Sequence, residues 1–184
     1  ALVPGSRAIV RDVGLNPGRT GLLDVLRRMG AAVRVESSRV VCGEPRGDVV
    51  IEQAPLRGTE VHASEVPSLV DEVPLVAVLG AFAAGEPLVC GAADLRNKES
   101  DRIRAVVAGL RAMGANTEEL PDGFCVRGPG RLHGAEIDSA GDHRIAMAFG
   151  GAALAADGPT TIHGAEWAAI SFPTFWSVLG AQTS

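Results

Sequence analysis

Apolar and polar residues follow two different spacings along the chain, and these spacings predict two kinds of element. Short runs rich in valine and isoleucine predict strands, and apolar residues that recur every three or four positions predict helices. The strands are expected at 8–13, 32–36, 48–51, 59–63, 87–90, 116–119, 124–127, 135–138 and 160–163. The helices are expected from Pro17 to Met29, over 69–84, 98–113 and 142–156, and from about Pro173 onward. Strands and helices therefore alternate through the whole sequence.

Short sequences recur along the chain in the same order. The hexapeptide Leu26–Ala31, LRRMGA, returns 84 residues later as Leu110–Ala115, LRAMGA, and Gly58–Val61 returns as Gly134–Ile137. The recurring order is strand, helix, strand, helix and strand pair. It predicts an α/β (α+β) fold of repeated βαβαββ units, with helices packed on small sheets.

The repeats predict a single domain made of about three such units. We expect these units at 1–57 together with 171–184, at 58–133 and at 134–170. Because the first repeat starts unevenly, we also expect a partner segment outside this chain.

Composition narrows the class of protein. Hydrophobic residues make up 46% of the chain and charged residues 21%, which is typical of a soluble globular protein. The formal net charge of -5 argues against a general nucleic-acid surface, so any anion site must come from cations placed locally. The longest apolar runs, Val73–Ala84 and Ile145–Ala156, are shorter than the roughly 20 residues that a membrane span needs. Neither a nucleic-acid partner nor a membrane is expected.

The cysteines point to a reducing compartment. Cys42, Cys90 and Cys125 are an odd number without close pairs, which favours reduced, buried thiols in a cytosolic protein. The chain also starts without the pattern of a signal peptide. No two histidines have the spacing of metal ligands, so neither a metal nor a cofactor is expected.

The segment Asp94–Ile103, DLRNKESDRI, is the most informative charged motif. It follows a predicted strand and leads into a predicted helix, with Asn97 or Ser100 as the expected N-cap. The motif places three charged residues in or near the first helical turn, Lys98, Glu99 and Arg102. Cations at the positive end of a helix are unfavourable unless an anion sits among them. A carboxylate beside that anion can act as an acid or a base.

Taken alone, this motif is explained more simply by a surface ion pair between Glu99 and Arg102, worth less than about 1 kcal/mol. A second motif changes the balance. In Gly141–Arg144, GDHR, Asp142 is the expected N-cap of the next helix, so His143 and Arg144 occupy its first two positions.

Arg19 gives a third helix start that carries a cation. Three such starts on repeated units predict helix N-termini directed at one common anion. Because the planar guanidinium matches phosphate and carboxylate groups, Arg102 and Arg144 are the expected direct ligands. For His143, a structural role and contact with substrate are both open.

A pair of carboxylates, Asp71 and Glu72, lies inside the otherwise apolar segment Val66–Pro74. Buried carboxylates without partners are unfavourable. The pair is therefore either at an exposed helix start or directed into a cleft, where one member can act as a base.

These motifs resemble those of a known family. Leu95–Ile103 is similar to the LRxKESDRI motif of the 5-enolpyruvylshikimate-3-phosphate (EPSP) synthases, and Gly141–Met147 to their GDHRIAM signature. Gly14–Gly21, Val66–Pro74 and Ser171–Pro173 also match, in the family's order and spacing. The resemblance covers essentially the whole chain.

The resemblance implies transfer of the enolpyruvyl group from phosphoenolpyruvate to the 5-hydroxyl of shikimate 3-phosphate, with release of phosphate. It also implies two similar domains of three βαβαββ units each. Because the chain is under half the family's usual length, it corresponds to the C-terminal domain. The absent N-terminal domain would supply further substrate-binding residues, so the chain is expected to be inactive alone.

The resemblance also implies roles for individual residues. Asp71 would be the base near the 5-hydroxyl, and Glu99, assisted by Lys98, would move protons at the methylene carbon of phosphoenolpyruvate. The expected substrate-binding residues are Arg102 and Arg144 on the carboxylate and phosphate of phosphoenolpyruvate, His143 in the same pocket, and Asp94 on the substrate.

The chain departs from the family pattern at three positions. Asp94 stands where Asn or Glu is frequent, Asn97 replaces a small apolar residue, and Ile170 stands where some members carry a phosphoenolpyruvate-binding lysine. Two alternatives remain open. One is a domain like that of UDP-N-acetylglucosamine 1-carboxyvinyltransferase, which lacks this pair of charged motifs, and the other is a non-catalytic anion-binding fragment.

Overall fold

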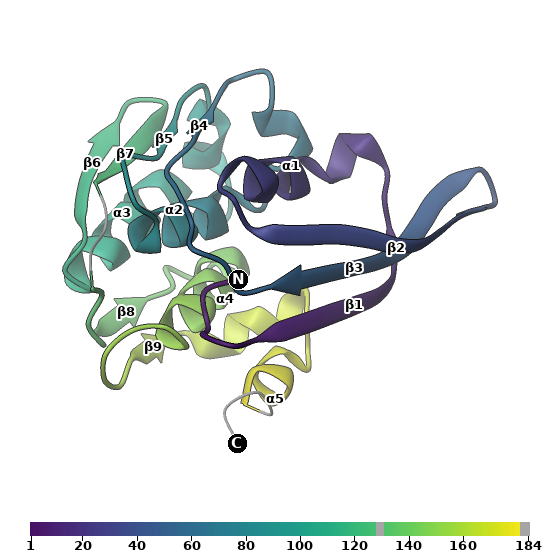
Figure 1. Ribbon diagram of the computed structural model, residues 1–184. Helices are drawn as coiled ribbons and strands as arrows, with labels where there is room; N and C mark the ends of the chain where they lie inside the picture. The colour runs from purple at the N-terminus through teal and green to yellow at the C-terminus, as the bar shows by residue number, and fades with distance from the viewer. Residues whose placement is uncertain (128–130, 181–184) are drawn as a thin grey trace.

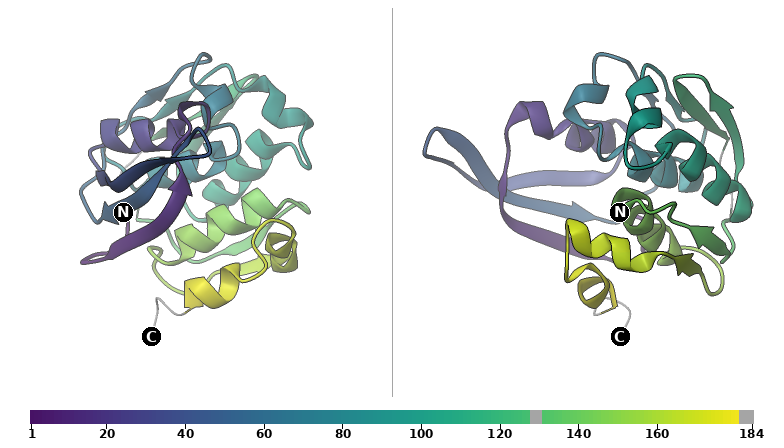
Figure 2. Two further views of the ribbon diagram at one scale, coloured as in Figure 1. Left: turned by 90° about the vertical axis from the view of Figure 1, so that its right-hand side faces the viewer. Right: turned by 180° about the vertical axis from the view of Figure 1, so that it is seen from behind.

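The computed structural model describes residues 1–127 and 131–180, and in it three small sheets surround a group of packed helices (Figure 1). The helices of this group are α2 (Val73–Phe82), α3 (Arg102–Ala112) and α4 (His143–Ala153). Each of the three contacts the other two. Figure 2 shows the sheets on different sides of these helices. The predicted mixed α/β class is confirmed.

The first sheet is antiparallel, in the order β1-β3-β2. It contains β1 (Arg7–Gly14), β2 (Ala32–Val41) and β3 (Glu44–Glu52), with η1 (Pro17–Arg19) and α1 (Gly21–Arg28) between β1 and β2. Strands β2 and β3 are longer than predicted, because Cys42 and Gly43 have φ of 51° and 83° and form a tight hairpin turn. Cys42 is exposed at the tip of this hairpin, so the prediction that it is buried is wrong.

The second sheet has the order β4-β5-β7-β6, and the third is the parallel pair β8-β9. In the second sheet β4 pairs parallel with β5, whereas β7 pairs antiparallel with both neighbours. The strands are β4 (Glu60–Val61), β5 (Leu88–Val89), β6 (Asn116–Leu120), β7 (Gly123–Arg127), β8 (Glu136–Asp138) and β9 (Thr161–His163). The predicted hairpin of β6 and β7 is confirmed.

Backbone hydrogen bonds recur together with the repeated sequences. The N–H of Arg57 donates to the carbonyl of Met29 at 2.8 Å, and the N–H of His133 donates to the carbonyl of Met113 at 2.9 Å. A second pair of hydrogen bonds matches in the same way. The N–H of Ala84 donates to the carbonyl of Leu56 at 2.9 Å, and the N–H of Asp157 donates to the carbonyl of Leu132 at 2.8 Å. The junction between α1 and β4 therefore has the same backbone construction as the junction between α3 and β8.

Three helices begin later than predicted, and the first of them, α1, starts at Gly21 after η1 rather than at Pro17. Helix α3 starts at Arg102, because the side chain of Asp101 accepts from the N–H of Arg104 at 3.0 Å and caps the helix. Neither predicted N-cap is used, and residues 93–97 instead form the short 3-10 helix η3 (Ala93–Asn97). Helix α2 starts at Val73, after η2 (Val66–Ser68).

The chain ends in η4 (Ala165–Ile170) and α5 (Phe175–Gly180), and α5 packs against α4. A Cβ at Gly150 of α4 would lie 3.0 Å from the rings of Phe175 and Trp176, so glycine permits this contact. None of the helices in the described residues is long and apolar enough to cross a membrane.

Most of the buried apolar residues form one continuous core. Helices α3 and α4 approach closely within it, because a Cβ at Gly109 would lie 2.2 Å from the ring of Phe149. The core also contains a charged side chain, since Arg102 is 2% exposed. Cys90 and Cys125 are partly buried, and burial raises the pKa of both thiols.

Candidate active site

Three arginines from separate elements meet around the carboxylate of Asp71. Arg102, in the first turn of α3, and Arg144, in the first turn of α4, each have a guanidinium nitrogen 3.2 Å from an Asp71 oxygen. Arg19, at the end of η1, lies 3.6 Å from the same carboxylate. The structure thus brings the three predicted cationic segments together, with Asp71 between them.

Arg102 is the buried centre of this arrangement. Its Nε donates to Asp142 at 2.8 Å, and its Nη2 donates to Glu99 at 2.6 Å. Together with the contact to Asp71, one guanidinium therefore joins three carboxylates. Burial alone lowers the pKa of Arg102, but its contacts with Asp142, Glu99 and Asp71 together outweigh burial and raise the pKa above its ordinary value.

Asp142 has two functions in this structure. Its side chain caps α4 as predicted, accepting from the N–H of Arg144 at 2.8 Å, and it also holds Arg102 and accepts from the Ser100 hydroxyl at 3.1 Å. It is 0% exposed. The sequence indicated the cap but not the contact with Arg102, because side chains 40 residues apart give no local signal of their pairing.

Burial by itself raises the pKa of Asp142, but the hydrogen bonds from Arg102 and the Arg144 N–H outweigh it, so the pKa is lowered in the folded state. A depressed carboxyl pKa stabilises the fold above the pKa of the unfolded state, about 3.9, and that contribution disappears as the pH falls through the folded pKa. We therefore expect the free energy of unfolding to fall more steeply below about pH 4 in the wild type than in Asp142→Asn. Urea unfolding between pH 7 and acid measures this.

The exposed carboxylate of Asp24 supplies the control for this experiment, since its side chain is 67% exposed. Asp24→Asn is expected to keep the acid sensitivity of the wild type. If Asp142→Asn and Asp24→Asn had the same pH slope, the buried pair would not be a source of acid lability.

Asp71 and Glu72 differ in their electrostatic surroundings. Partial burial raises the pKa of Asp71, but Arg144 and Arg102 outweigh it and hold the pKa below its ordinary value. Glu72 is 3.8 Å from Arg144, yet burial, with the charge of Asp71 added, raises its pKa. Neighbouring carboxyl groups whose pKa values are pushed apart are typical of acid–base sites.

His143 and Arg144 contact each other directly. The Arg144 Nε donates to the His143 Nε2 at 3.1 Å, so this ring nitrogen is the acceptor and a neutral ring carries its proton on Nδ1. His143 is 8% exposed, whereas the Arg144 side chain is 27% exposed. The histidine therefore orients an arginine that solvent can still reach.

Lys98 and Asp94 are not drawn into this cluster. Both are exposed, and within residues 1–127 and 131–180 neither forms a hydrogen bond or ion pair with another site residue. Lys98 has extended backbone at the end of η3, just before Glu99. Ile170, at the position of the expected lysine in some family members, is 64% exposed.

A cavity of about 240 Å³ opens beside the cluster. Its charged end is formed by Asp71, Glu72 and Arg144. Apolar side chains of α2, α4 and α5 form the remaining wall, among them Leu75, Met147, Phe175 and Leu179. The site therefore combines an anion-binding rim with an apolar wall.

Solved structures share this fold. An EPSP synthase from Acinetobacter baumannii superposes with a TM-score of 0.91 at 41% identity, over 97% of this chain and 42% of that one. The enolpyruvyl transferase NikO from Streptomyces tendae has a TM-score of 0.70 at 24% identity, over 96% of this chain and 38% of that one, and shows likeness of fold alone. The chain thus has the fold found in part of the enolpyruvyl transferases.

Sequence comparison narrows this class to one family. The family described as EPSP synthase (3-phosphoshikimate 1-carboxyvinyltransferase) matches residues 1–179 of this chain. The chain therefore belongs to this family. A 3-phosphoshikimate 1-carboxyvinyltransferase from Synechococcus sp. (strain JA-3-3Ab) is 50% identical over 95% of this chain and 39% of its own length. The 3-phosphoshikimate 1-carboxyvinyltransferase from Acaryochloris marina (strain MBIC 11017) is 49% identical over 97% of this chain and 40% of its own length. The chain spans about two fifths of these relatives, and the predicted family is confirmed.

Proposed function

We propose that this chain is the C-terminal half of a cytoplasmic enzyme of the shikimate pathway. The enzyme transfers the enolpyruvyl group of phosphoenolpyruvate to the 5-hydroxyl of shikimate 3-phosphate and releases phosphate. The convergence of Arg19, Arg102 and Arg144 on Asp71 supports this most directly, since two phosphorylated anions need positioned cations. An N-terminal domain outside residues 1–184 would complete the cleft.

In this proposal the arginines exchange partners when substrate binds. In the structure the carboxylates of Asp71, Glu99 and Asp142 neutralise Arg102 and Arg144, and the short contact of Glu99 to Arg102 occupies one guanidinium edge. The Glu99 side chain is 49% exposed and is free to move away, so a substrate carboxylate or phosphate can take its place on Arg102. Arg144, with His143 behind it, binds the other anionic group.

The same exchange activates the carboxylates. Asp71 is a weak base while Arg144 and Arg102 depress its pKa. Once those cations are shared with substrate phosphate and carboxylate, the Asp71 pKa rises, and the side chain accepts the proton of the 5-hydroxyl. Glu99, released from Arg102, donates and removes protons at the methylene carbon.

Two exposed side chains of the same segment complete the assignment. Lys98 precedes Glu99 and assists its proton transfers, and Asp94 accepts a hydrogen bond from the substrate. Their exposure is consistent with contacts to substrate or to the absent domain rather than within this chain. The three-unit division, 1–57 with 171–184, 58–133 and 134–170, is likewise proposed; residues 128–130 and 181–184 lie outside the described part.

Reconstitution tests the proposed function. The chain is mixed with the N-terminal domain of a related EPSP synthase, and phosphate release is measured with phosphoenolpyruvate and shikimate 3-phosphate. We expect turnover from the mixture and none from either part alone. If the chain alone turned over as an intact enzyme does, the proposed half-site would be refuted.

The same assay separates the alternatives. Replacement of shikimate 3-phosphate by UDP-N-acetylglucosamine is expected to abolish phosphate release, and turnover with the UDP-sugar would instead favour the sister carboxyvinyltransferase. A folded complex of the two domains without any phosphate release would favour a non-catalytic anion-binding fragment.

A further inference from the structure

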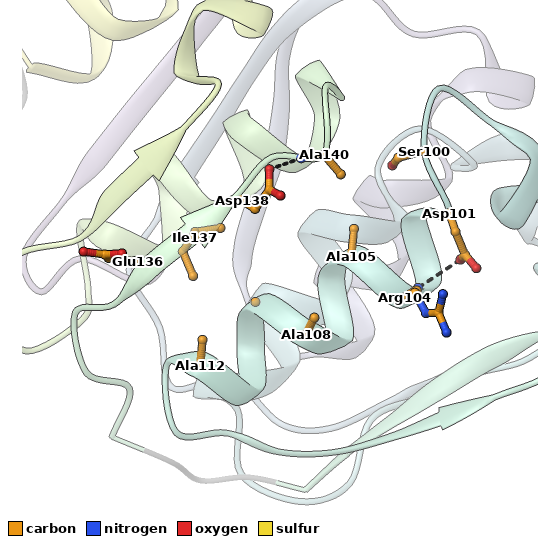
Figure 3. A pocket seen from close by; sticks show the side chains of 11 residues that line it. Ser100, Asp101, Arg104, Ala105, Ala108, Ala112, Glu136, Ile137, Asp138 and Ala140 are labelled. Carbon is orange, nitrogen blue, oxygen red and sulfur yellow. Dashed lines mark hydrogen bonds between the residues drawn. The ribbon is translucent and has the colours of Figure 1, made fainter.

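We propose that the groove between α3 and β8 binds an arginine side chain presented by a short segment of another polypeptide. This α3–β8 groove is a cavity of about 380 Å³, within the usual range of ligand sites, about 300–1,000 Å³. One wall is the small-residue face of α3, with Ala105, Ala108 and Ala112 (Figure 3). Strand β8 forms the facing wall.

The equivalent junction elsewhere in the chain shows what fills such a space. Between α1 and β4, Arg28 donates from Nη2 to the carbonyl of Glu60 at 3.0 Å and from Nη1 to the carboxylate of Glu65 at 2.7 Å. A third contact joins its Nε to the hydroxyl of Thr59 at 3.4 Å. The side chain of Arg28 therefore fills the space between α1 and β4.

Two differences leave the second junction open. In the repeated hexapeptides, Leu26–Ala31 and Leu110–Ala115, the residue at the place of Arg28 is Ala112. The links also differ, because residues 62–72 join β4 to α2, whereas only residues 139–142 join β8 to α4. The longer link contains η2, which covers the far end of the first junction: a Cβ at Gly21 would meet its Ser68.

One of the three acceptors that hold Arg28, the strand carbonyl of Glu60, has an equivalent in the open groove, whereas Ala135 stands at the place of Thr59 and Glu65 belongs to the longer link. Along β8, the carbonyl of Ala135 accepts from Thr161 and the N–H of Ser139 donates to His163, so alternate residues face β9. Since the hydrogen-bonding direction alternates along a strand, the carbonyl of Glu136 faces the other way, as that of Glu60 does in β4. An external guanidinium can therefore occupy the place equivalent to that of Arg28.

The charges of the groove suit a cation. Glu136 and Asp138 of β8 line the groove, and Asp101, whose carboxylate is paired with Arg96 at 2.8 Å, lies at the opposite end. The Glu136 carboxylate lies 3.6 Å from the His163 Nε2 of β9, and the Asp138 carboxylate accepts from the N–H of Ala140 at 2.8 Å, so no arginine or lysine of the described residues pairs with Asp138.

Arg104 is the cation among the residues that line the groove, and its side chain extends away from β8 (Figure 3). The apolar stem of an arginine would cover the alanine face while its head meets the β8 edge.

Binding is tested with two matched peptides, an acetylated and amidated alanine pentapeptide with a central arginine and the same peptide with citrulline. Methyl signals of alanines in the labelled 184-residue chain are followed by NMR. We expect the signals of Ala105, Ala108 and Ala112 to shift with the arginine peptide alone. If neither peptide shifted them, or both did so equally, the proposal would be overturned.

Filling the groove from within gives an independent test. Ala112→Arg is expected to melt about 2–4 °C above Ala112→Gln and to abolish the peptide response, because its side chain repeats the contact of Arg28. Asp138→Asn retains the oxygen that accepts from the Ala140 N–H. We expect this variant to bind the arginine peptide with about two- to fivefold lower affinity. A melting temperature of Ala112→Arg no higher than that of Ala112→Gln, or unchanged affinity in Asp138→Asn, would contradict the proposal.

Discussion

Arg102→Met is expected to lower the free energy of unfolding by about 3–5 kcal/mol. The arginine is 2% exposed and Asp142 is 0% exposed, so its removal leaves a buried carboxylate without its main partner. The cost comes mainly from that uncompensated charge, because methionine restores much of the lost packing volume. Urea unfolding followed by circular dichroism measures it.

The control is an arginine with a similar partner at the surface. Arg27 contacts Asp24 at 2.7 Å, but its side chain is 45% exposed. Arg27→Met is therefore expected to lower the free energy of unfolding by no more than about 1 kcal/mol. If Arg102→Met cost as little as Arg27→Met, Arg102 would not be the organising group of the site.

Glu99→Gln is expected to reduce turnover of the reconstituted enzyme by about 10²–10⁴-fold, the usual loss when a general acid–base group is removed. Glutamine keeps an oxygen acceptor for the contact with Arg102, and the side chain is 49% exposed, so stability should change little. Phosphate release gives the rate. Exchange of the methylene protons of phosphoenolpyruvate with D2O, followed by NMR, reports the proposed proton transfer itself.

Glu86 is a suitable control because it is a surface glutamate, 65% exposed, near Arg127 on the second sheet. Glu86→Gln should leave turnover and exchange unchanged. Retention of more than half of the wild-type exchange rate by Glu99→Gln would remove Glu99 from the proposed chemistry.

Sequence periodicity was sufficient for the class of fold and for most elements, because apolar spacing reflects burial directly. It failed at two element boundaries, one set by a single hydrogen bond and one hidden by polar residues within a strand. The cap by Asp101 set the start of α3, and polar residues such as Ser37 and Arg39 hid the continuation of β2 toward the turn at Cys42.

Part of the candidate site was also predictable from the sequence. Cations at helix starts predicted that Arg102 and Arg144 face one common anion, and the structure brings both to the carboxylate of Asp71. The burial of Arg102 and its bond to Asp142 were not predictable, because burial depends on packing between α3 and α4 rather than on local sequence.

The extended hairpin of β2 and β3 has a practical consequence. Its tip carries Cys42 in the open, whereas Cys90 and Cys125 are partly covered and their thiolates are disfavoured. A maleimide dye should thus attach selectively at this projecting end. Paired with a second dye on an N-terminal domain, it would report by energy transfer how the two halves approach each other.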